Sequence, residues 1–209
     1  MRRWPTHLTG TLPPLLLAGI GLSHPMELTP ETAGWWTTMH IVLVPVFPLL
    51  GVGLWFLVRG VPGVLAWAVR VAAFLYASFY GVVDAVAGIG AGALVSNGVA
   101  AGRGPDADGR DPALDHLFAI GNEVGTVGGW AFLAGSAALA VLAWRRWGPA
   151  ALPGGLLTVA AAWSFVGSHI YWPLGVATMV ALALGLGLLG EARLRHEDRA
   201  RGPVGDRAA

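Results

Sequence analysis

Apolar stretches, most of them long enough to cross a membrane, limit how this 209-residue chain can fold. Six of them follow one another, and most have about the 17–25 residues that cross a bilayer as an α-helix. They lie at about 8–22, 37–58, 71–96, 117–144, 151–168 and 171–189. Open strands would leave backbone groups unsatisfied in lipid, so only helices fit. The sequence therefore predicts an all-α, polytopic transmembrane bundle of six helices.

The composition agrees with a membrane protein and excludes several kinds of chemistry. Charged residues make up 12% of the chain, about half the share of a soluble domain. Cysteine is absent, which excludes disulfides, thiolate metal sites, iron–sulfur clusters and cysteine nucleophiles. Neither the loops nor the tail carries a nucleic-acid motif. We therefore expect a lipid bilayer and no nucleic acid as partner; homo-oligomerisation is left open.

Arginine placement predicts the orientation in the membrane, because cytoplasmic loops carry an excess of basic residues. The chain has arginine but no lysine, and an even number of crossings puts most arginines on one face. That face carries Arg2, Arg3, Arg59, Arg70, Arg145, Arg146, Arg193, Arg195, Arg199, Arg201 and Arg207. Only Arg103 and Arg110 fall on the other face. We expect both termini on the cytoplasmic side of a bacterial inner membrane, in a multi-pass topology.

The first apolar segment has a second interpretation. Arg2 and Arg3, a short apolar core and then 22-LSHP-25 are similar to a secretory signal peptide. The small-residue cleavage pattern is poor, which favours a retained helix. Cleavage would leave five helices with the same threading.

The chain is expected to form one transmembrane domain, residues 1–190, followed by a cytoplasmic charged tail, residues 191–209, that extends the last helix and then becomes disordered. The outer loop 97–115 is the one long polar connection. Within it, Asp111 followed by Pro112 is a good helix start, with Asp as the N-cap. The acidic stretch 106-DADGRD-111 lacks the EF-hand spacing, so we interpret it as a solvated loop.

Rare polar residues of the apolar segments gather toward the outer side. With a rise of about 1.5 Å per residue, Asp84 lies about 21 Å above Arg70, and Glu123 about 33 Å from Arg145. His40 lies about 28 Å from Arg59, and His169 ends the fifth segment. These four residues predict an outward-facing polar pocket. His24 and His116 lie at helix ends, and 24-HP-25 is more simply explained as a turn.

Each of these four residues also has a structural explanation. Asp84 is expected to face the bundle interior, because a carboxyl facing lipid is costly. Glu123 is nearer water, and His40 is adjacent to an interfacial Trp-rich stretch. His169 precedes a helix break at Pro173, where it satisfies freed backbone groups. The pairs Gly88 with Gly92, and Gly121 with Gly125, predict close helix approach in lipid.

Imidazoles and carboxylates without thiols suit a divalent metal such as zinc or iron, with His40, Asp84, Glu123 and His169 as candidate ligands. Three alternatives remain open at this point. Haem between His40 and His169 would indicate electron transfer. Asp84 and Glu123 would serve proton-coupled transport. Buried acids that only join helices would belong to a structural or accessory protein. The small-molecule or ion ligand, and whether any reaction is catalysed, are not predicted.

Overall fold

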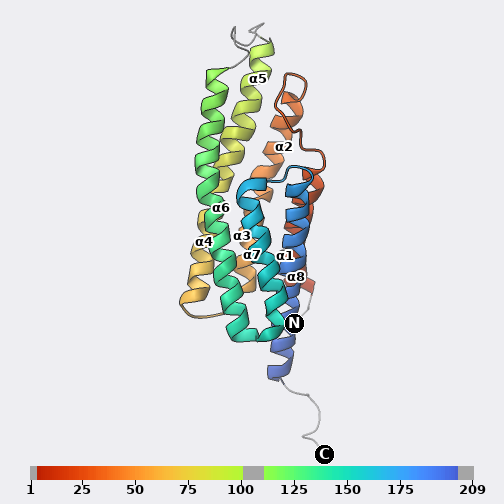
Figure 1. The fold of residues 1–209 in the computed structure, drawn as a ribbon, viewed down its shortest axis with the longest axis vertical. Helices are drawn as coiled ribbons and strands as arrows, with labels where there is room; N and C mark the ends of the chain where they lie inside the picture. The colour runs from red at the N-terminus through yellow and green to blue at the C-terminus, as the bar shows by residue number, and fades with distance from the viewer. Residues whose placement is uncertain (1–3, 101–110, 202–209) are drawn as a thin grey trace, which may run out of the picture.

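The computed structural model describes residues 4–100 and 111–201, with the side chains of 4–7 and 99–100 left aside. Within these ranges the fold is all-helical and contains no strand (Figure 1). The elements are α1 (Trp4–Gly21), α2 (Ala33–Val46), α3 (Pro48–Leu57), α4 (Val64–Val83), the π-helical segment η1 (Asp84–Gly90), α5 (Ala91–Ala100), α6 (Pro112–Trp147), the 3-10 turn η2 (Pro149–Ala151), α7 (Leu152–Ser168) and α8 (Leu174–Arg201).

Five helical stretches in the described residues are long and apolar enough to cross a membrane. They are Ala33–Leu57, Val64–Gly98, Pro112–Trp147, Pro149–Ser168 and Leu174–Arg201. Large apolar side chains such as Leu16, Phe74 and Leu184 are exposed on the outside of the bundle, where lipid accommodates them. The chain is therefore a multi-pass membrane protein. A sixth crossing depends on the shorter apolar stretch Leu8–Gly21 in α1, and stays a prediction.

The second predicted segment is divided in the structure. The second segment was expected as one helix over 37–58, but it consists of α2 and α3, which meet at Phe47. Pro45 and Pro48 explain the junction, because proline has no N–H and disfavours helical geometry in the preceding residue. The hydroxyl of Tyr76 donates to the carbonyl of Phe47, 3.1 Å away, at this junction.

The helical hairpin formed by α4–η1–α5 and α6 is longer than expected. The α4–η1–α5 rod and α6 extend upward beyond the α7–α8 connection (Figure 1). The predicted start of α6 is confirmed: Asp111 is its N-cap, and Oδ1 of Asp111 accepts from the Ala113 N–H at 2.9 Å. The rest of the acidic loop, 101–110, lies outside the described residues, with Arg103 and Arg110.

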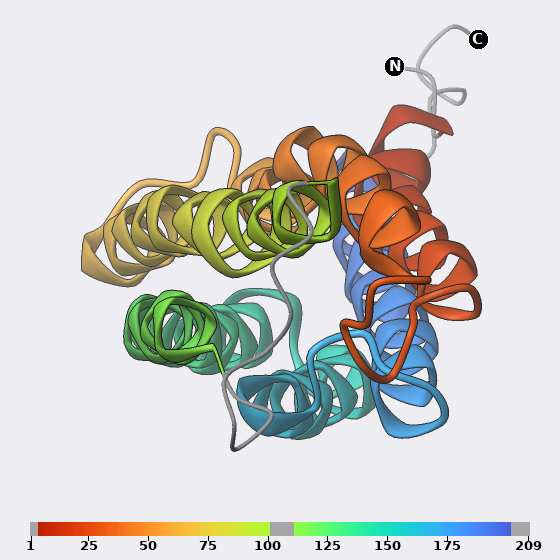
Figure 2. The ribbon, with the colours of Figure 1, turned by 90° about the horizontal axis from the view of Figure 1, so that it is seen from above.

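The lower parts of α4 and α6 form a closed ring with α7, α8, α1 and α3. Viewed from above, α4 packs on α6, α6 on α7, α7 on α8, α8 on α1, α1 on α3 and α3 on α4 (Figure 2). The interior is filled by aromatic side chains, among them Phe47, Tyr76, Phe132 and Phe165, all nearly inaccessible to solvent. This aromatic layer forms the floor beneath the site described next.

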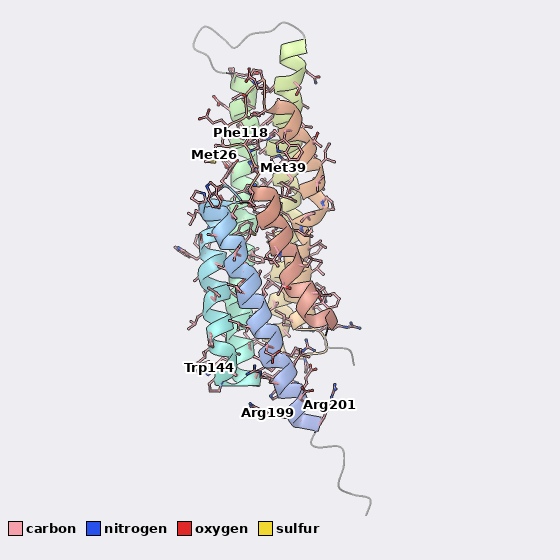
Figure 3. The ribbon with its side chains drawn as sticks, turned by 90° about the vertical axis from the view of Figure 1, so that its right-hand side faces the viewer. Met26, Met39, Phe118, Trp144, Arg199 and Arg201 are labelled. Atoms are coloured by element: carbon pink, nitrogen blue, oxygen red, sulfur yellow. The ribbon has the colours of Figure 1, made fainter. Side chains whose placement is uncertain are left out.

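Arginines gather at the lower end of the bundle, where Arg199 and Arg201 are labelled (Figure 3). Arg193 of α8 donates to the carbonyls of Phe56, Leu57 and Arg59 at the end of α3. Helix α8 continues to Arg201, so the first part of the predicted tail is helical. Arg2, Arg3 and Arg207 lie outside the described residues.

Candidate metal centre

Three histidines from distant parts of the sequence converge at the top of the ring. His24 lies in the loop between α1 and α2, His40 in α2, and His169 directly after α7. Each offers one ring nitrogen, and these three nitrogens all lie within 4.8 Å of one another. His24 and His40 are buried, with 6% and 4% of their surfaces exposed. His169 is half-buried. Three imidazoles together are a metal-ligand set that needs no thiolate.

The position of His24 follows from how α1 ends. Gly21, the last residue of α1, packs so closely on the Ile170 carbonyl that a Cβ at this position would collide with it. This contact brings the chain after α1 beside the residue that follows His169. His169 itself has φ of 46°, a left-handed conformation that costs energy for a residue with a side chain. The strained turn directs the imidazole back into the bundle.

His40 is set in place by a second close approach. The His40 ring lies against Gly88 of η1, and a Cβ on Gly88 would collide with the ring atoms. Gly88 thus leaves the room that the imidazole occupies. A π-helical segment such as η1 inserts an extra residue into a helix turn and is frequently found at functional sites.

Each of the three histidines has a hydrogen-bond partner at Nδ1. The Nδ1 atoms of His24 and His40 pair with the carbonyls of Pro25 and Trp36, both at 2.7 Å. Because a carbonyl only accepts, these two imidazoles carry their proton on Nδ1 and present a lone pair at Nε2. Nε2 of His24 is buried and has no hydrogen-bond partner within residues 4–100 and 111–201.

The Nδ1 atom of His169 pairs with the hydroxyl of Tyr80 at 2.9 Å. A hydroxyl both donates and accepts, so Nε2 of His169 is free to bind a metal when the Tyr80 oxygen accepts from Nδ1. This pattern, in which the ring nitrogen that does not bind metal is held by an oxygen, is typical of metal-binding histidines.

Aromatic rings enclose the group. The His24 ring lies 5.3 Å from the His40 ring and 5.6 Å from the His169 ring, in edge-on contacts. Tyr171 packs on His24 with ring centroids 4.3 Å apart, and Trp36 lies 5.0 Å from both His24 and His40. These contacts hold the imidazoles in one arrangement.

The environment keeps the histidines outside the membrane-spanning helices uncharged. Burial lowers the pKa of His24 to about 4 against the opposing effect of its hydrogen bond to Pro25, and the nearby His40 lowers it further. Burial also holds the pKa of His169 well below its usual value, with His24 and His40 adding to the effect. Both imidazoles are therefore neutral at pH 7, which is the form that binds metal.

A cleft of about 360 Å³ opens beside the histidines, between α2, the α4–η1 rod, α6 and α7. Its lining includes His40, His169, Phe118, Asn122 and Thr126. Phe118, and Met39 next to His40, lie in the upper half of the bundle, far from Arg199 and Arg201 (Figure 3). The cleft gives water or a small molecule a route to two of the imidazoles.

The structure brings together two of the four candidate ligands predicted from the sequence, and leaves the other two outside the group. His40 and His169 come together, as their similar depth predicts. Glu123 is exposed on α6, while Asp84 is fully buried in η1. Among the described residues, the group of converging ligand atoms includes neither carboxylate.

His24 is the site residue that sequence reasoning left out. The sequence favours a turn at 24-HP-25, but in the structure the turn lies at residues 22 and 23, and the His24 imidazole that follows it is buried. The pairing of Gly21 with Ile170 that places it is a tertiary contact. The available signal was depth: His24 ends the first apolar segment on the same side as His40 and His169. His116, also at a helix end, is exposed at the start of α6.

No family model matches the chain, and neither the curated proteins nor the solved structures contain a significant match to it.

Proposed function

We propose that this multi-pass membrane protein binds a divalent transition-metal ion through His24, His40 and His169. The observation that carries the proposal is the convergence of three ring nitrogens to within 4.8 Å. It is supported by the oxygen partner at each Nδ1 and by the buried, unbonded Nε2 of His24. Three imidazoles suit zinc, iron or copper.

The distances between the three histidine nitrogens are somewhat longer than the distances between the ligands of a bound zinc ion. Zinc holds imidazole nitrogens at about 2.0–2.1 Å, so three tetrahedral ligands lie about 3.3 Å from one another. Small rotations of the rings close the group from its present spacing to that distance. The fourth position remains for water or a small ligand that enters through the cleft, as in zinc sites that keep an open position.

The same geometry favours a single ion over haem. Two axial histidines would have to hold a porphyrin between them. His24 lies against both other imidazoles, at 5.3 Å and 5.6 Å between ring centroids, and a porphyrin between His40 and His169 would displace it. The aromatic floor below the site also supports access from one end only, in place of a transport path through the bundle.

The orientation of the bundle in the membrane follows from its arginines. Arg199 and Arg201 lie at the opposite end of the bundle from Met39, which precedes His40 (Figure 3). The arginine rule then puts the arginines in the cytoplasm of a bacterial cell and the metal on the outer side of the inner membrane. Both termini are then cytoplasmic, and α1 provides the sixth crossing.

Metal analysis of the purified protein in detergent tests the proposal. We expect about one zinc ion per chain after zinc loading and removal of excess metal, and loss of that ion in His24→Ala, His40→Ala and His169→Ala. His116→Ala is the matched control, because it removes an exposed histidine on the same side and keeps the ion. Equal zinc content in all five proteins would contradict the proposal.

A further inference from the structure

Asp84 is the buried group that the three-histidine site leaves unexplained. None of its surface is exposed, and both carboxyl oxygens lack a hydrogen-bond partner among the described residues. A buried acid without a partner is unusual in native proteins and calls for a cause, such as an ion that is bound during function.

The α4–η1 rod places Asp84 on the same buried face as two residues that contact the site. Buried positions recur along the α4–η1 rod at Tyr76, Tyr80, Asp84 and Gly88. Tyr80, one turn before Asp84, bonds to His169, and Gly88, about one turn after it, contacts His40. Residues four apart lie on nearly the same helix face. Asp84 therefore lies on the stripe between the two residues of this helix that touch the site.

Among the described residues, no cationic side chain pairs with Asp84. The elements packed against η1 are α2, α4, α5 and α6. The titratable groups that interact with Asp84 are Tyr76 and Tyr80 from α4. His40 of α2 lies against Gly88, and α5 contains no charged residue. From α6, Glu123 is exposed. An unpaired carboxylate sealed from water is far more costly than the neutral acid.

A divalent ion at the histidines changes this balance. Three neutral imidazoles leave the full double positive charge of the ion uncompensated in a medium of low dielectric, where charges interact strongly. Ionisation of a carboxyl group in the same buried interior, such as that of Asp84, then becomes favourable.

Building on the proposed function, we propose that Asp84 is the counter-charge of the bound metal: it holds a proton while the site is empty and releases it when a divalent cation binds. In this step the cation enters, the O–H bond of the Asp84 carboxyl breaks, the carboxylate stays in the bundle, and the proton leaves to bulk water. No electron is transferred. The protein thus exchanges one proton for each divalent cation, with Asp84 acting through charge and outside the ligand set.

Calorimetric titration with Zn²⁺ tests this in buffers of different ionisation enthalpy, which gives the number of protons released per ion. The comparison uses wild type, Asp84→Asn and Glu123→Gln in detergent at constant pH. Because the histidines and any zinc-bound water are common to all three proteins, the difference between wild type and Asp84→Asn isolates the Asp84 proton. Glu123→Gln is the matched control, since it removes an exposed carboxyl on α6.

We expect Asp84→Asn to release about one proton fewer per zinc than wild type and to bind zinc at least about tenfold more weakly. Glu123→Gln should match wild type in both quantities. Asp84→Ala serves if Asp84→Asn does not fold, because the carboxyl has no hydrogen bond to lose and alanine is smaller. Equal proton release and affinity in wild type and the Asp84 variants would overturn the role of Asp84 while metal binding stands. Zinc binding that does not depend on the histidines would overturn the proposed function itself, and this inference with it.

Discussion

At the scale of single residues, the candidate metal centre depends on what holds the far side of each imidazole. Two of the three Nδ1 atoms pair with main-chain carbonyls, which no substitution removes. The third pairs with the side chain of Tyr80 at 2.9 Å. That hydroxyl is therefore the one oxygen partner that mutation can delete without touching a ligand.

Replacing Tyr80 by phenylalanine should weaken zinc binding by about 10–100-fold, the usual effect of removing an outer partner of a ligating histidine. The ring, which packs against Phe165 and His169, is retained. Competition with a coloured chelator measures the affinity. Tyr76→Phe is the control: it deletes the hydroxyl that bonds to Phe47, at a cost of about 1 kcal/mol in stability. An equal loss of affinity in both variants would show that Tyr80 acts only through the stability of the fold.

At the scale of helices, close packing between α2, the α4–η1 rod and α6 shapes the site. The predicted glycine pairs are confirmed. Gly121 and Gly125 of α6 lie against Ala87 and Val83, and Gly92, like Gly88, lies against α2. Spacing along the sequence was sufficient to predict the close approaches. It was not sufficient to predict which helix each glycine meets, because that depends on the closure of the whole ring.

Adding one methyl group at Gly88 should displace the His40 ring, because the new Cβ would collide with it. We expect Gly88→Ala to lower zinc occupancy to a small fraction of the wild-type value while the helical content by circular dichroism is unchanged. Gly81→Ala is the matched control in the same rod, since a Cβ there meets nothing within 4 Å. Wild-type occupancy in Gly88→Ala would mean that the contact with Gly88 does not position His40.

For the whole molecule, apolar length predicted the helices and the membrane environment, because the bilayer imposes both. Depth along the helices predicted that His40 and His169 lie at one level. The same reasoning could not place Glu123, since a helix at the outer edge can turn a carboxylate away from the bundle, and Glu123 is exposed. His24 belongs to the ligand set and Asp84 lies outside it because of tertiary contacts, which no local sequence pattern predicts.

The orientation can be measured directly because the chain has no cysteine. We expect a single cysteine at Glu31→Cys, in the loop before α2, to react with a membrane-impermeant maleimide in intact bacterial cells. A cysteine at Glu197→Cys, near the end of α8, should react only after the cells are made permeable. Both positions are at the surface, and they belong to opposite ends of the bundle. The reverse pattern of labelling would invert the proposed topology and place the histidines on the cytoplasmic side.

X-ray absorption spectroscopy of the zinc-loaded protein shows whether the three histidines bind the ion, because it counts the ligands around it. The proposed site predicts three imidazole nitrogens at about 2.0–2.1 Å, completed by one oxygen from water. In His24→Ala, any zinc that remains should show two imidazoles. A first shell made mainly of oxygens, or one that His24→Ala leaves unchanged, would contradict a metal centre formed by His24, His40 and His169.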